Sequence, residues 1–275
     1  MQRLVWSDSI LSLEGGLRFK RYFDFFPYKS ISNWWDALGG AGKPIYVVQT
    51  NEEIVKRCIL MTTDPGDLVL DPTCGSGTTA YVAEQWGRRW ITTDTSRVAL
   101  ALGRTRLMSA RYSYYLLRDS DEGASKEAEL SGRAEGEARF RGDVRRGFVN
   151  RRELHITSSA IANNAEIDVI WERWQPTLES LRGKLNAALR QSWEDWQVPR
   201  AADEKWPAAA RAVHREWWDL RRKRQAEIDE SIARAAASDP IELYDRPYEA
   251  KNTVRVTGPF TVESLSPHRV LPTDE

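Results

Sequence analysis

Two aspartates that flank a glycine-rich turn are the residues best suited to bind a ligand. Asp71 follows the apolar run LVL at 68–70, and Asp94 follows the next apolar run, 23 residues later. Between them lies the turn GSGTTA at 75–80. Glycine lets the backbone approach a ligand closely because it has no Cβ. The spacing therefore predicts a binding site at the ends of two neighbouring strands.

The residues of this turn discriminate between the ligands that such turns bind. A phosphate-binding P-loop needs a lysine after its last glycine, and none occurs here. The pattern GxGxxA is by itself a weak sign of a dinucleotide site, and the carboxylate of Asp71 would repel a pyrophosphate. S-adenosylmethionine carries an ammonium and a sulfonium, and backbone N–H groups of the turn can hold its carboxylate. We therefore expect S-adenosylmethionine, with its ribose hydroxyls held by Asp94. A turn without a ligand and an NAD-binding oxidoreductase are the alternatives.

The apolar pattern around the turn predicts strands and helices in alternation. We expect strands at 68–70 and 89–93, and between them a helix from about 78 to 86 that Thr78 can cap and Gly87 stops. This order is typical of an α/β fold with parallel strands. A further helix follows the second strand, with one face formed by Val98, Ala101, Leu102 and Thr105.

Another helix is predicted before the turn, in the segment TNEEIVKRCILM. Thr50 and Glu53 have the spacing of a capping box, and Ile54, Cys58 and Met61 recur at helical spacing. We therefore expect the chain to enter this helix at Thr50.

The strings LDPTCGSGTT and GRRWITTDTS together resemble the cofactor motif of the amino-group DNA methyltransferases, which methylate adenine N6 or cytosine N4. The likeness is closest to adenine methyltransferases of the type III modification-subunit kind. It implies a Rossmann-like, S-adenosylmethionine-dependent methyltransferase fold, here incomplete, with a mostly helical C-terminal extension. It also implies DNA as the partner, together with an upstream catalytic half or a restriction subunit.

The resemblance also assigns roles to single residues. Asp71, Gly75 and Gly77 would line the methionine end of the cofactor, and Asp94 its ribose. Thr50 and Asn51 match a cofactor-flanking motif, but Glu52-Glu53 stand where the family usually has Lys-Pro. Cys74 would lie near the cofactor as a small buried residue. The full predicted cofactor set is Thr50, Asn51, Asp71, Thr73, Cys74, Gly75, Ser76, Gly77, Thr78 and Asp94.

The catalytic motif of this family, [Asp/Asn/Ser]-Pro-Pro-[Tyr/Phe/Trp], does not occur in the sequence. In that motif the acidic or amide side chain and a proline carbonyl accept the hydrogens of the amine, and the aromatic residue stacks on a flipped base. DFFPY (24–28) and DRPY (245–248) are near misses, and we expect Tyr248 to pack rather than to act. The catalytic residues are thus unknown. We expect the chain to be the C-terminal, cofactor-binding part of a methyltransferase, inactive if its catalytic half is a separate chain.

The composition of the chain bears on its charge, on metal binding and on its place in the cell. The 275 residues carry a formal net charge of zero, so any contact with DNA would come from local patches. Two cysteines are too few for a zinc site, and we expect no metal. No apolar run approaches 18 residues and no signal peptide is evident, so we expect a cytoplasmic chain without membrane contact.

The composition changes several times along the chain. We expect five segments, which are the end of an upstream region (1–43), the cofactor-binding α/β segment (44–117), a charged mobile insertion (118–147), a mixed and then tryptophan-rich helical region (148–237) and an extended tail (238–275).

Overall fold

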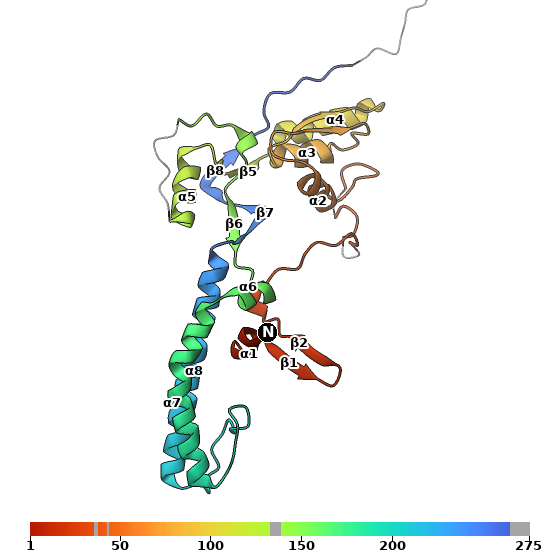
Figure 1. Ribbon diagram of the computed structural model, residues 1–275. Helices are drawn as coiled ribbons and strands as arrows, with labels where there is room; N and C mark the ends of the chain where they lie inside the picture. The colour runs from red at the N-terminus through yellow and green to blue at the C-terminus, as the bar shows by residue number, and fades with distance from the viewer. Residues whose placement is uncertain (36–37, 43, 133–138, 265–275) are drawn as a thin grey trace, which may run out of the picture. The chain divides into compact units, whose positions relative to one another are not determined.

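The computed structural model describes residues 1–35, 38–42, 44–132 and 139–264, and the chain forms two compact units (Figure 1). Unit 1 combines Met1–Ile31 with Arg152–Glu242, and unit 2 combines Ser32–Arg151 with Leu243–Glu275. One boundary falls between Ile31 and Ser32, and the other two fall within β6 (Asn150–Glu153) and β7 (Ile241–Pro247), which pair with each other. Each unit is thus built from two segments that are far apart in sequence, so this division differs from the five consecutive segments expected.

A strand–helix–strand element forms the centre of the candidate site in unit 2. β3 (Leu68–Asp71) and β4 (Arg89–Thr92) pair in parallel, in a register that sets Asp71 opposite Thr92, and α3 (Thr78–Gln85) connects them. Val82 and Ala83 of α3 are buried in a core that Val69 and Trp90 also join. The predicted strands and the helix between them are therefore confirmed, within one or two residues at each end.

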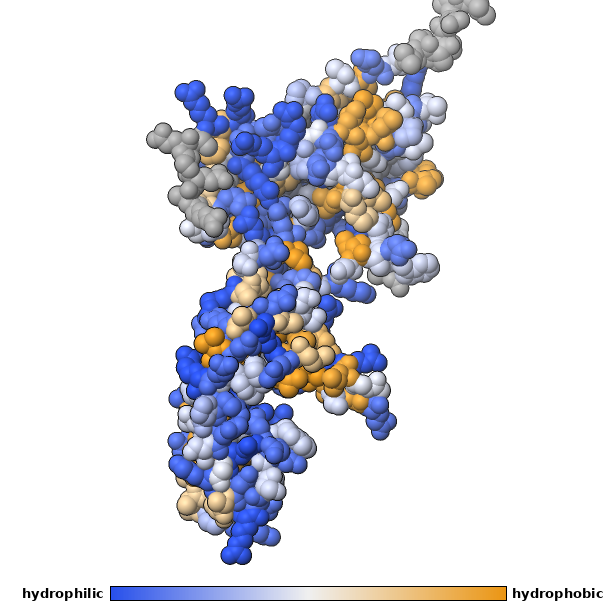
Figure 2. Space-filling view, viewed as in Figure 1, coloured by the Kyte–Doolittle hydropathy of each residue, from blue (hydrophilic) through white to orange (hydrophobic). Residues whose placement is uncertain are grey.

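The opposite face of this two-stranded sheet is open. Leu68, Leu70 and Ile91 are exposed by 50%, 65% and 50%, whereas the alternate residues are half-buried. Figure 2 shows that hydrophobic side chains reach the molecular surface in several places. Side chains of a strand point to opposite faces in turn, so one face packs on α3 and the other meets solvent.

Two further helices belong to this part of unit 2, and in both the expected details were wrong. α2 (Glu52–Thr62) is capped by Asn51, whose side chain accepts the N–H of Glu53 at 2.9 Å, so the helix does not begin at Thr50. α4 (Arg97–Ser109) buries Ala99, Gly103 and Leu107. The predicted face with Val98 is the exposed one, because small residues allow the close approach of α4 to the rest of unit 2.

The rest of unit 2 corrects the expected mobile insertion. Residues Asp121–Ser131 form helix α5, because Ser120 caps its first turn by accepting the N–H of Gly123 at 3.1 Å. A 3-10 turn, η2, covers Val144–Arg146. β5 (Tyr112–Tyr115) pairs antiparallel with β8 (Glu249–Arg255), a strand within the tail segment 238–275. The remainder of the insertion at 133–138 and of the tail at 265–275 lies outside the described residues.

Unit 1 begins with α1 (Gln2–Trp6), the hairpin of β1 (Ile10–Leu13) and β2 (Gly16–Phe19), and the 3-10 turn η1 (Phe23–Phe25). These elements precede α6 (Ser158–Asn163) and two long helices that pack on each other, α7 (Glu166–Leu189) and α8 (Ala208–Ala237). Trp217 is fully buried with Leu178, Leu181 and Leu185, as expected for tryptophans at helical spacing. No helix among the described residues has the length and apolarity needed to span a membrane.

Candidate functional site

The turn after β3 has a backbone conformation that favours glycine. Gly75 and Gly77 have φ values of 52° and 75°, in the left-handed region that side chains disfavour. The N–H of Gly77 donates to the carbonyl of Cys74 at 2.8 Å and closes the turn. Gly77 also stands at the N-cap of α3, so the expected cap by Thr78 was wrong. Thr78 is instead the first residue of the helix, and its hydroxyl lies 3.0 Å from the hydroxyl of Ser76.

Asp94 lies against this turn, as its position after β4 predicts. Its Oδ2 accepts the N–H of Gly75 at 2.9 Å, and its Oδ1 accepts the N–H of Ser96 at 2.8 Å. The N–H groups of Ser96 and then Gly75 hold the pKa of this carboxyl below its usual value. Each carboxylate oxygen can accept more than one hydrogen bond, so Asp94 can still receive a hydroxyl from a ligand.

Asp71 stands at the other side of the turn. Its Oδ1 accepts the backbone N–H and the hydroxyl of Thr73 at 3.0 and 3.2 Å. Throughout the described part of the chain, neither Asp71 nor Asp94 forms an ion pair, and Oδ2 of Asp71 accepts no hydrogen bond. Two negative charges therefore flank the turn, and no basic side chain of the described residues pairs with either.

The negative charge of the two aspartates affects Cys74, the residue that precedes the turn. Its side chain is buried, as expected for a small filler, and the glycine of α4 that faces it is Gly103. Burial, and also the charges of Asp71 and Asp94, raise the pKa of the Cys74 thiol. The thiol is therefore held in its neutral form, which does not suit a nucleophile.

The two residues of the flanking motif have other surroundings or partners in the described part of the chain. Thr50 is exposed. Asn51 caps α2, and its Nδ2 donates to the carbonyl of Gly39 at 3.1 Å. Among the described residues neither side chain forms a hydrogen bond with the turn. Their predicted cofactor contacts remain a prediction.

Two residues that the sequence did not single out do reach the turn. The ring of Tyr46 lies beside Gly75, where a Cβ would stand 3.7 Å from Cδ1 of the tyrosine. The guanidinium of Arg106, on α4, donates to Ser76 and Thr78 at 3.0–3.3 Å. The sequence around Tyr46 has no motif that marks a ligand site. Arg106 lies in a helix, and its sequence position does not show which distant turn its side chain contacts.

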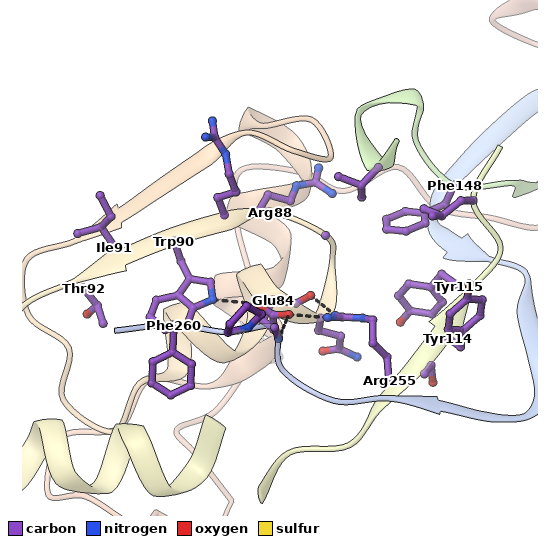
Figure 3. A pocket seen from close by; sticks show the side chains of 18 of the residues that line it. Glu84, Arg88, Trp90, Ile91, Thr92, Tyr114, Tyr115, Phe148, Arg255 and Phe260 are labelled. Atoms are coloured by element: carbon purple, nitrogen blue, oxygen red, sulfur yellow. Dashed lines mark hydrogen bonds and ion pairs between the residues drawn. The ribbon is translucent and has the colours of Figure 1, made fainter. Parts of the chain in front are cut away.

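A cavity of about 800 Å³ lies beside β4 but does not include Asp71, Gly75 or Asp94 (Figure 3). Its wall holds Glu84, which accepts the indole N–H of Trp90 at 3.0 Å and pairs with Arg255. The carboxylate of Glu84 is thus paired with a basic side chain, unlike the two aspartates of the turn.

The near-miss motif DRPY lies elsewhere in unit 2. Tyr248 donates its N–H to the carbonyl of Val149 at 2.8 Å and accepts the N–H of Leu116 at 2.9 Å. The Lys126 ammonium lies 4.8 Å from the centre of its ring. These contacts support the packing role expected for Tyr248. Asp245 and Pro247 line a second cavity of about 450 Å³, together with Glu52 and Lys56.

Comparisons with known proteins find similarity to DNA methylases in the part of the chain that contains the glycine turn. Residues 15–103 match the model of a family described as DNA methylase. The type II methyltransferase M2.DpnII of Streptococcus pneumoniae is 36% identical over 100 residues, which are 36% of this chain and 34% of that protein. The DNA adenine methyltransferase YhdJ of Escherichia coli (strain K12) is 41% identical over 66 residues, 24% of this chain and 22% of that protein.

A shorter match is the type II methyltransferase M.BamHI of Bacillus amyloliquefaciens, 54% identical over 39 residues, 14% of this chain and 9% of that protein. The chain thus spans about a third or less of the length of these relatives. Their names are those of type II enzymes and of an adenine methyltransferase, not of type III modification subunits or oxidoreductases. The glycine turn, its two aspartates and helices α2 and α3 lie within residues 15–103, and this part of the chain is similar to the family described as DNA methylase.

Proposed function

We propose that this chain is the cofactor-binding part of a site-specific DNA methyltransferase with a Rossmann-like fold. It would take part in the transfer of a methyl group from S-adenosylmethionine to an exocyclic amine of a DNA base. The name of YhdJ, a DNA adenine methyltransferase, favours adenine N6, with cytosine N4 as the alternative.

The observation that carries the proposal is the pair of carboxylates without ion-pair partners at the turn, Asp71 and Asp94. Two unit charges 4 Å apart interact by about 1 kcal/mol in water and about 4 kcal/mol near a protein surface. A pyrophosphate beside Asp71 would be repelled by an energy of this order, whereas an ammonium or sulfonium would be attracted. The charge of the site therefore favours S-adenosylmethionine over NAD.

The residues of the turn also fit the shape and hydrogen-bonding groups of this cofactor. The left-handed Gly75 and Gly77 keep the approach to the backbone free of Cβ atoms, and Asp94 retains lone pairs for the ribose hydroxyls. We assign the methionine end to Asp71, Gly75 and Gly77. S-adenosylmethionine, when bound, supplies an electrophilic methyl group on its sulfonium.

The roles of this chain are to bind and orient the donor. The family-type Pro-Pro catalytic motif does not occur in its sequence, so the proposal names no residue here that accepts the hydrogens of the amine. A partner that carries this motif, either a catalytic half or a modification-system subunit, would hold the flipped base.

Calorimetric titration of the full chain with S-adenosylmethionine and with NAD tests the ligand. We expect binding of the first and none of the second, and Asp71→Asn should weaken binding at least tenfold because it removes one charge from the site. Glu122→Gln, an exposed carboxylate change in α5, is the matched control and should leave the affinity within twofold. Tight NAD binding without a response to S-adenosylmethionine would overturn the proposal.

A second measurement tests the reaction. The chain is incubated with DNA and labelled S-adenosylmethionine, and the nucleosides are separated to distinguish N6-methyladenine from N4-methylcytosine. Donor binding without methyl transfer would identify the chain as a cofactor-binding part that needs a partner. Transfer by this chain alone that is lost in Asp245→Ala would show that DRPY is catalytic.

A further inference from the structure

Arg106, on helix α4, forms hydrogen bonds with the glycine turn, with the first residue of α3 and with the first turn of α2. Its Nη1 donates to the carbonyl of Ser76 and the hydroxyl of Ser76, each at 3.3 Å, and to the hydroxyl of Thr78 at 3.0 Å. Its Nη2 donates to the carboxylate of Glu52, at the first turn of α2. One guanidinium on α4 thus holds both the glycine turn and the start of α2.

The surroundings of Arg106 keep this arrangement in one geometry. Only 12% of its side chain is exposed, and the guanidinium carbon lies 4.7 Å from the centre of the Tyr81 ring. The acceptors Ser76 and Thr78 are themselves buried. A guanidinium has five donors in a planar fork, so a lysine at this place could not reach the turn and Glu52 together with the same geometry.

This contact also gives a physical role to the departure at Glu52-Glu53, where the family usually has Lys-Pro. Glu52 provides the negative charge that Arg106 needs on the side away from the turn. Glu53 has a different task, because it forms ion pairs with Lys56 and Arg57 along α2. The acid at position 52 is therefore matched to a cation on α4, 54 residues later.

On this basis we propose that Arg106 is a positioning residue for the cofactor turn, and that Glu52 is its counter-ion. Arg106 donates to the carbonyl of Ser76 and thereby fixes the orientation of the turn. The same turn is held by Asp94 through the N–H of Gly75. The role of the turn as a donor site rests on the function proposed above, whereas the ordering of the turn by Arg106 does not.

Four variants of the full chain test this assignment, namely Arg106→Met, Arg106→Lys, Glu52→Gln and, as matched control, Arg104→Met. Arg104 is exposed on the same helix. Three quantities are measured for each, namely the Kd for S-adenosylmethionine by calorimetry, the melting temperature and the hydrogen–deuterium exchange of residues 74–80. Arg106→Met should raise the Kd at least tenfold and speed the exchange of the turn, and Arg106→Lys should restore part of the affinity. The control should stay within twofold.

A double-mutant cycle shows whether Arg106 and Glu52 act together. Because they share one ion pair, the effects of Arg106→Lys and Glu52→Gln on Kd should be less than additive. If the Arg106 variants lower the melting temperature but leave Kd and turn exchange unchanged, the arginine is merely structural and the inference is overturned. If Arg106→Met does not fold, Arg106→Lys and Glu52→Gln decide by the same criteria.

The binding of S-adenosylmethionine by the wild-type chain distinguishes failure of this inference from failure of the proposed function. Absence of S-adenosylmethionine binding by the wild type, with faster turn exchange in the Arg106 variants, would overturn the donor site and leave the ordering of the turn supported. Binding by the wild type that no Arg106 or Glu52 variant changes would overturn the positioning role alone.

Discussion

The carboxylate of Asp94, at the end of one strand, accepts the backbone N–H of Gly75, in the turn that follows the neighbouring strand, at 2.9 Å. Nineteen residues separate the two positions. The hydrogen bond therefore needs the parallel pairing of β3 and β4, which brings the ends of both strands to the same edge. It also helps to hold the pKa of Asp94 below its usual value, since backbone N–H groups stabilise the charged carboxylate.

Asp94→Asn should weaken S-adenosylmethionine binding by about tenfold or more, because the amide presents a donor where the carboxylate accepts two N–H groups. Its effect on stability should depend on pH. The folded-state pKa of Asp94 lies below the unfolded value, so its contribution to stability is present above about pH 4 and is lost as the pH falls through the folded pKa. Urea unfolding of both proteins at pH 7 and pH 3 measures this. A stability difference that does not shrink at low pH would contradict the explanation.

Gly77→Ala should destabilise the chain by about 1–3 kcal/mol. The φ of Gly77 is 75°, and a Cβ at this position would lie 3.0 Å from Cα of Gly103. Gly183→Ala is the matched control, because Gly183 lies within α7, has no atom within 4 Å of an added Cβ and has no positive φ. The control should be neutral or slightly stabilising, since alanine favours helices more than glycine. Equal effects of the two changes on urea midpoints would exclude a special constraint at Gly77.

Alkaline pH should loosen unit 2 through Tyr112. This residue is 2% exposed, and burial raises the pKa of Tyr112 to about 12. The unfolded chain has a tyrosine pKa of about 10, so the stabilising contribution is complete below pH 10 and is lost as the pH rises through 12. A spectrophotometric titration should show one fewer late-titrating phenol in Tyr112→Phe. Tyr22, which is exposed, is the matched position, and Tyr22→Phe should leave the late-titrating phenol of Tyr112 in place.

The packing of α7 on α8 should depend on Leu185. This side chain is fully buried in the cluster with Trp217, so Leu185→Ala should cost about 2–5 kcal/mol by leaving a cavity. Val169→Ala, on the same helix but 64% exposed, should change stability by less than about 0.5 kcal/mol. Thermal unfolding followed by tryptophan fluorescence compares them. Similar melting temperatures for the two variants would argue against a packed interface at Leu185.

The elements around the turn could be read from sequence because their signals are local. An apolar run of three residues, a glycine turn and a second run suffice to predict β3, α3 and β4, and the acids at or just after the strand ends follow directly. The same local signals gave the helical region of α7 and α8. They did not predict α5, because its charged surface resembles that of a loop and its helix depends on the cap by Ser120.

Contacts between segments that are distant in sequence were decided only by the tertiary structure. Unit 1 joins residues 1–31 to 152–242, and no local pattern shows that these segments share one core. Helix α4 buries Gly103 rather than the face of Val98, because Gly103 allows close approach to Gly77. In the same way, the sequence by itself determined that two acids and two glycines form the turn, whereas only the fold decided that Arg106 and Tyr46 reach it. The physical reason is that hydrogen bonds and packing depend on distance in space, and side chains such as Arg106 meet their partners only when the helices are in place.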